Sequence, residues 1–322
     1  KTPAIVKNSS QPTESLVNNT RAKIMKAEPI INPSSMGYSR SGVAYALLSG
    51  IIFAVMGITV QFTRGVIESH QLVFFRCLFG LFILAPWTYK EIGHLFQKQG
   101  WVLWLRGVAG SLAMIAFFWN LQHTTYGTAI SLTLTAGIFV TLLSGWLLKE
   151  PLKASETIAI LMVIAGAISL YIPEYQRPSL EVTVVGILGA LLGAVALLSL
   201  RQAAKKYPPS LIVGIFYLMG ILLAPMIGGT ENWVYPSLEN SPNIAIVAIG
   251  GLLAQLSMTR AFHYLRAPIA ASIVLTRLLW GIFFEYLLTQ HSPAPFAWIG
   301  YSLIIAGVMA LQLASSRVSV KF

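Results

Sequence analysis

Residues 42–63 read GVAYALLSGIIFAVMGITVQFT, without a single Asp, Glu, Lys or Arg. A bilayer core of about 30 Å requires a helix of roughly 20 mostly apolar residues. Similar runs recur along the chain, separated by short polar segments. We expect ten spans, over 42–63, 70–89, 101–122, 125–147, 153–173, 181–201, 208–228, 243–265, 267–289 and 293–314.

The composition agrees with a membrane protein. The chain has 322 residues, of which 56% are hydrophobic and only 10% are charged. A soluble protein of this length needs more charged residues to cover its surface. Only helices and closed barrels satisfy their backbone groups in lipid, and barrel strands alternate in segments of about ten residues. We therefore predict an all-α membrane protein with ten transmembrane helices.

The formal net charge of +11 does not indicate nucleic-acid binding, because the charges are scattered in the segments between apolar runs. If the N-terminus is cytoplasmic, the inner loops and C-terminus hold ten Lys and Arg, and the outer loops hold only Arg64 and Arg177. Positive charge favours the cytoplasmic side. We expect a multi-pass plasma (inner) membrane protein with both termini in the cytoplasm.

The two ends of the chain are predicted to be tails. Residues 1–40 are polar and basic and are expected to form a disordered cytoplasmic tail, with Met25 and Met36 as candidate natural starts. Residues 316–322 are expected to form a short cytoplasmic C-terminal tail. The chain has no P-loop, no CxxC pair and no paired histidine spacing, so we expect no cofactor and no metal.

The chain contains an internal repeat. Residues 107–170 align without a gap onto residues 248–311, at an offset of 141. Any two apolar helices share Leu, Ala and Gly, but here one register holds across three spans and their loops. Among the matched pairs are Gly110 with Gly251, Thr135 with Thr276, and Gly166 with Gly307.

The repeat has a consequence for topology. It divides the chain into a first five-span repeat, 41–176, and a second, 177–315. Because five is odd, the second repeat must enter the membrane upside down relative to the first. Inverted repeats are typical of secondary transporters, whose halves exchange conformations around a central site.

Four short motifs lie at Phe74–Gly80, Arg106–Gly110, Leu147–Leu152 and Met258–Phe262. Together they resemble motifs of the EamA-type drug/metabolite transporter superfamily, and the resemblance covers residues 42 to 314. Two features depart from the family pattern: Gly137 stands where the fourth span usually has Pro, and Gln290-His291 stands where the ninth usually ends in Gly-Glu. The resemblance implies a metabolite carrier, often an exporter.

Arg277 is the strongest candidate for binding a substrate. It lies about ten residues into the ninth span, where an Arg costs roughly 2.5–3.5 kcal/mol on insertion scales. Its guanidinium is expected to face the interior and to pair with a substrate carboxylate or phosphate, with Trp280 as a stacking surface and Thr276 beside it. The alternative is a structural link between helices.

Other residues are predicted to line a pathway because polar and aromatic groups in lipid should face the bundle interior. Arg106 and Arg260 are closer to cytoplasmic span ends and are expected to anchor at the headgroups. Arg76 is deeper and is either an architectural residue or a pathway residue. The predicted pathway residues are Thr135, Trp119, Asn120, Tyr217 and Gln255.

Two residues are candidates for a role in the transport cycle. Glu285 is the only carboxylate placed within a span rather than at its edge, so it is the candidate for proton coupling; the alternative is that it reaches the outer headgroups. Gly137 is a hinge candidate, because it occupies the place of the family's Pro. Close helix packing is the alternative for Gly137.

The predicted function is secondary transport of a small organic metabolite by alternating access. The solute is expected to be amino-acid-like, nucleoside-like or another zwitterion or anion; export and proton coupling are both open. A channel or facilitator is the alternative, whereas an intramembrane enzyme is disfavoured because the chain has no Asp and no histidine at mid-span. The expected partners are the solute and membrane lipids, and the expected state is a monomer or homodimer.

Overall fold

The apolar runs form helices, as backbone hydrogen bonding in lipid requires. The structure is a computed structural model that describes residues 39–93, 100–124, 126–147, 153–171, 178–289 and 297–316. These residues belong to the unit Gly37–Phe322, and no strand occurs among them. The expected tails and the departure at Gln290-His291 lie outside the described residues, apart from a few residues at the tail boundaries.

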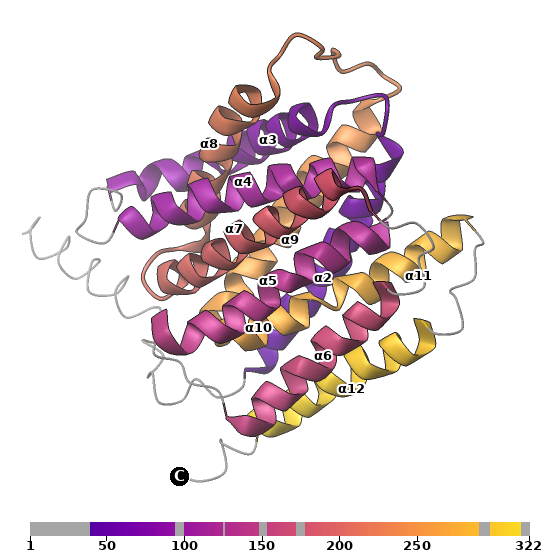
Figure 1. Ribbon diagram of the computed structural model, residues 1–322. Coiled ribbons are helices and arrows are strands. Elements are labelled where there is room, and N and C mark those ends of the chain that lie inside the picture. Colours follow the sequence, from indigo (N-terminus) through magenta and orange to yellow (C-terminus); the bar gives the residue numbers. More distant parts are fainter. Residues whose placement is uncertain are drawn as a thin grey trace, which may run out of the picture. The chain divides into compact units, whose positions relative to one another are not determined.

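The helices follow the chain in order and are labelled in Figure 1. Among the described residues, seven stretches are long and apolar enough to cross a membrane, namely α2, α3, α4, α7, α8, α9 and the joint segment Ala267–Leu288. The protein is therefore an integral membrane protein, and the expectation of ten spans stays a prediction. The bounds are α2 Arg40–Phe62, α3 Ser69–Lys90, α4 Trp101–His123, α5 Tyr126–Leu147, α6 Ala154–Tyr171, α7 Leu180–Ala204, α8 Pro209–Gly228, α9 Ser241–Tyr264, α10 Ala267–Val274, α11 Arg277–Thr289 and α12 Ala297–Ser316.

The ninth expected span is not one continuous helix. It is interrupted at Leu275 and Thr276, between α10 and α11. The Thr276 N–H donates to the Ile273 carbonyl at 3.0 Å, and the Leu278 N–H donates to the Leu275 carbonyl at 3.1 Å. These are i→i+3 bonds of the 3₁₀ type, which replace the α-helical pattern at the interruption. Arg277 is consequently the first residue of α11.

Long-range packing pairs each early helix with a later one. Helix α4 packs along α7, α2 along α9, α3 against α8, and α6 against α12. Figure 1 shows α6 and α12 side by side. The bundle core is thus built from helices that are far apart in the sequence.

Glycines allow the closest of these contacts. A Cβ on Gly166 of α6 would lie 2.7 Å from the Gly300 carbonyl oxygen and 2.9 Å from the Ile304 nitrogen. A Cβ on Gly307 of α12 would lie 2.8 Å from the Ala159 carbonyl oxygen and 2.9 Å from the Val163 nitrogen. The two backbones are therefore too close for any side chain at either glycine.

The crossing of α3 and α8 shows the same arrangement. Gly80 of α3 packs against the Tyr217 ring of α8, and Gly220 of α8 packs against the Cys77 side chain of α3. Each helix thus presents a glycine to a larger residue of the other. This brings Arg76, next to Cys77, into the bundle interior, where only 2% of its surface is exposed.

Candidate functional site

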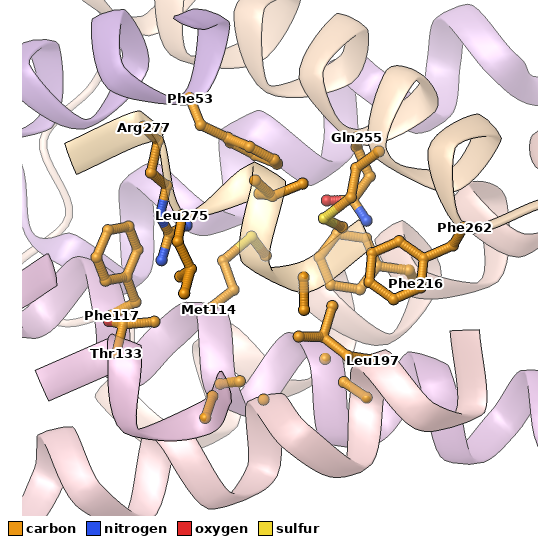
Figure 2. Close-up of a pocket in the computed structure, with 18 of the residues that line it drawn as sticks. Phe53, Met114, Phe117, Thr133, Leu197, Phe216, Gln255, Phe262, Leu275 and Arg277 are labelled. Carbon is orange, nitrogen blue, oxygen red and sulfur yellow. The ribbon is translucent and has the colours of Figure 1, made fainter. Parts of the chain in front are cut away.

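A central cavity lies among these helices and has a volume of about 150 Å³. Its lining is mostly apolar and aromatic, with Phe53, Phe117, Phe216 and Phe262 among the side chains drawn in Figure 2. The lining residues come from α2, α3, α4, α5, α7, α8, α9, α10 and α11. A cavity of about 150 Å³ is large enough for a benzene-sized molecule, so this conformation has room for a small solute.

Three arginines line the cavity: Arg76 of α3, Arg106 of α4 and Arg277 of α11. Arg76 and Arg106 are buried, and Arg277 is half-buried. The ε-nitrogen of each is buried and has no hydrogen-bond partner among the described residues. No Asp or Glu is found among the lining residues of the described chain. The cavity is therefore cationic without an internal counter-charge.

Arg277 lies where the sequence predicted, facing the interior. Its guanidinium carbon is 5.1 Å from the centre of the Phe117 ring, which gives a cation–π contact. The Tyr126 hydroxyl donates to the Arg277 carbonyl at 3.4 Å. A Cβ on Gly50 of α2 would lie 3.4 Å from the Arg277 nitrogen, so α2 packs directly on the helix interruption. Tyr126 and α2 together position the first turn of α11.

Arg106 also points into the cavity. Its guanidinium carbon is 4.6 Å from the centre of the Phe216 ring, and only 3% of its surface is exposed. The expectation that Arg106 anchors at the headgroups is therefore wrong, because the side chain turns inward against α8. Arg260, by contrast, is exposed and lies 5.7 Å from the Tyr45 ring, so its anchoring role stays a prediction.

Arg76 lies between two aromatic rings. Its guanidinium carbon is 5.6 Å from the Phe118 ring centre and 5.7 Å from the Tyr217 ring centre. One terminal nitrogen contacts the Met114 sulfur, and the other donates to the Gly251 carbonyl at 3.4 Å. These contacts hold Arg76 without neutralising its charge, because none of its partners is an acid.

Gln255 and Gly137, both predicted from the sequence, line the cavity, as does Thr133. Gln255 of α9 is buried, and its amide nitrogen has no hydrogen-bond partner in the part of the chain that the structure describes. Gly137 and Thr133 contribute from α5. Helix α5 is continuous through Gly137, so the interruption occurs in the ninth span rather than at the hinge candidate.

The remaining predicted residues lie outside the lining. The hydroxyl groups of Thr135 and Thr276 donate to backbone carbonyls of Leu132 and Ile273, both at 2.7 Å. Trp280 does not line the cavity either. Their roles in binding stay predictions.

Three further predicted residues pack behind the cavity wall. Trp119 stacks on His123, with ring centres 3.9 Å apart. The Asn120 amide, oriented to satisfy both its groups, donates to the Val182 carbonyl at 3.3 Å and accepts from the Gly186 N–H at 3.2 Å, which ties α4 to α7. Tyr217 is fully buried against α3.

Glu285 lies in a different place. It lines a second cavity of about 270 Å³, together with Gln61, Arg64 and Thr124. Arg64 donates to the Thr124 carbonyl at 2.7 Å, which joins the end of α2 to the end of α4. Glu285 does not line the central cavity, and its coupling role stays a prediction.

Sequence reasoning did not assign Arg76 and Arg106 to the cavity. The available signal was the cost of any Arg inside a span. Arg106 is only six residues from the start of α4, so its depth alone suggested the interface. The direction of its side chain, which depends on Phe216 from another helix, could not be read from its own segment.

Comparison with known proteins agrees with the resemblance noted above. The EamA-like transporter family matches the chain twice, over residues 40–172 and 182–312. An uncharacterized transporter of Helicobacter pylori (strain J99) is 28% identical over 84% of this chain and 94% of its own. The pseudopaline exporter CntI of Pseudomonas aeruginosa is 26% identical over 85% of this chain and 96% of its own.

More distant relatives extend the comparison. Solute carrier family 35 member G1 of Mus musculus is 24% identical over 78% of this chain and 73% of its own. One solved crystal structure has a similar fold, with a TM-score of 0.72 and 16% identity over 87% of this chain and 99% of that chain. The family match spans most of the sequence, and the relatives named for their activity are transporters, not enzymes. The chain therefore belongs to the EamA-like transporter family and is a membrane transporter of a small solute.

Proposed function

We propose that the protein moves a small organic anion or zwitterion across the plasma membrane by alternating access between two inverted five-span repeats, 41–176 and 177–315. The observation that carries this proposal is the central cavity, which residues of both halves line and which holds Arg277 at a helix interruption. Interrupted helices in transporters mark sites at mid-membrane.

The packing supports the repeat. The 141-residue offset relates Ala159 and Val163 to Gly300 and Ile304, and it relates Gly166 to Gly307. Gly166 faces Gly300 and Ile304, while Gly307 faces Ala159 and Val163. Exchanging the two halves therefore maps this contact onto itself.

The helix pairs support it as well. Exchange of the halves maps the α4–α7 pair onto the α9–α2 pair, and it maps the α3–α8 pair onto itself. A pseudo-two-fold axis between the halves accounts for all of these pairings. Two near-equivalent halves can adopt each other's conformation, which opens the cavity first to one side and then to the other.

The direction and orientation are part of the proposal. The ten-to-two bias of Lys and Arg supports cytoplasmic termini. The name of the Pseudomonas relative, an exporter, supports export. Glu285 at the second cavity is the proposed coupling site for protons.

The test is counterflow in proteoliposomes. Vesicles loaded with an unlabelled amino acid, nucleoside or organic acid should transiently accumulate the labelled solute, and the rate should saturate. A non-saturating flux without counterflow would instead indicate a channel and would contradict alternating access.

A further inference from the structure

We propose that the central cavity binds its solute through two separate anionic groups, one beside Arg277 and one beside Arg76 and Arg106. This inference rests on the proposed function and narrows it to one class of substrate. The class comprises short organic acids with two or more negative groups, either carboxylate or phosphate.

The charges that line the cavity are all positive. Three guanidinium groups line the cavity, whereas no lining residue in the described ranges is acidic. Two described carboxylates within helices lie outside this lining: Glu156 pairs with Arg266, and Glu285 lines the second cavity. A single carboxylate on the solute would leave two of the three cations without a counter-charge, and buried charges are costly unless they are paired.

The three arginines lie on two different sides of the cavity. Figure 2 shows Arg277 and Phe117 on one side of the cavity, Phe216 on the other, and Met114 between them. Arg106 lies 4.6 Å from the Phe216 ring, and Arg76 lies 5.7 Å from the ring of the neighbouring Tyr217, so both charges belong to the Phe216 side. Two anionic groups on a short carbon chain can contact both sides at once, each with its own arginine.

The unpaired polar groups of the cavity are hydrogen-bond donors. The unpaired buried atoms of Arg76, Arg106, Arg277 and Gln255 are all nitrogens that donate hydrogen bonds. Carboxylate and phosphate oxygens only accept, and Arg binds them through its planar donor fork. The site therefore has unpaired donors, and a multiply charged acid would supply the missing acceptor oxygens.

The volume of the cavity limits the size of the solute. The cavity of about 150 Å³ holds a molecule near the size of a benzene ring in this conformation. A four-carbon dicarboxylate such as succinate is closest to this size and carries two negative groups. A tricarboxylate or a phosphorylated acid is larger and requires the cavity to widen.

The experiment measures the melting temperature of the full chain in detergent with increasing concentrations of each probe, at constant ionic strength. The probes are succinate, tricarballylate and phosphoenolpyruvate, and the matched control is succinamate, which replaces one carboxylate of succinate by an amide. A second charge-assisted contact should make succinate bind roughly 10- to 150-fold more tightly than succinamate. Comparison of tricarballylate with phosphoenolpyruvate distinguishes carboxylate from phosphate.

Variants locate the second group. Arg106→Gln should bring the succinate preference close to one, while succinamate binding at Arg277 is retained. Arg260→Gln removes an exposed Arg of α9 outside the cavity and should keep the full preference. Arg76→Gln and Arg106→Lys are measured in parallel, so that one poorly folded variant does not decide the result.

Three results would overturn the inference: equal affinity for succinate and succinamate, a preference that survives both Arg106→Gln and Arg76→Gln, or no stabilisation by any of the charged probes. If counterflow of a zwitterion or single-charge acid persists in the first two cases, only this inference fails. Loss of counterflow for every solute would overturn the proposed function as well.

Discussion

Replacement of Arg277 by Leu separates the two roles that this residue could have. An Arg near the bilayer centre costs roughly 2.5–3.5 kcal/mol to insert. The cation–π contact with Phe117 returns about 0.5–2 kcal/mol, and the ε-nitrogen has no hydrogen-bond partner among the described residues. The balance favours Leu or leaves the fold unaffected, so Arg277→Leu should insert, and its melting temperature should not fall.

Transport should respond differently. If Arg277 pairs with an anionic group of the solute, the lost contact is worth about 1.5–3 kcal/mol, or roughly 10- to 150-fold in KM for transport. Arg277→Lys should keep the charge but lose the planar fork, and it should fall between the wild type and Arg277→Leu. The assay is counterflow in proteoliposomes, with the amount of folded protein measured by size-exclusion chromatography.

The control is Arg260→Gln, which removes an exposed Arg that lies outside the cavity. It should leave KM within about twofold, because the side chain is exposed and is not part of the cavity lining. Normal transport by Arg277→Leu would refute the binding role. A failure of Arg277→Leu to fold would show instead that Arg277 links helices, as the alternative reading of the sequence states.

Further predictions concern topology, coupling and packing. Reporter fusions at Lys206 should be cytoplasmic and those at Asn240 external; a cytoplasmic signal at Asn240 would contradict the inverted repeat. Glu285→Gln should abolish proton-driven accumulation but keep exchange, and unchanged pH dependence of accumulation would exclude Glu285 as the coupling site. Gly166→Ala should destabilise the α6–α12 contact by about 1–3 kcal/mol, because the added Cβ would lie 2.7 Å from a backbone oxygen. Its matched control, Gly250→Ala, meets only a side-chain methyl group at 3.6 Å and should leave the melting temperature unchanged; equal effects of the two would refute the packing argument.

The sequence was sufficient for the class of protein and for its family. Length and hydropathy are properties of each segment by itself, so runs such as 42–63 predict membrane-spanning helices without knowledge of their neighbours. The family resemblance is confirmed by the two matches along the chain. The interior position of the Arg277 side chain could also be predicted from the sequence, because an Arg deep in an apolar run is costly to expose to lipid.

The tertiary structure decided which side chains share the cavity. These helices are apolar on most faces, so no stripe of polar residues indicates which face is interior. Arg106 turns inward because Phe216 of α8 lies beside it, whereas Glu285 of α11 lines the second cavity instead of the central one. Contacts between residues this far apart in the chain are absent from any local pattern. The packing of α2 on the interruption is likewise a tertiary feature, because Gly50 lies against Thr276 and Arg277, more than 200 residues away in the chain.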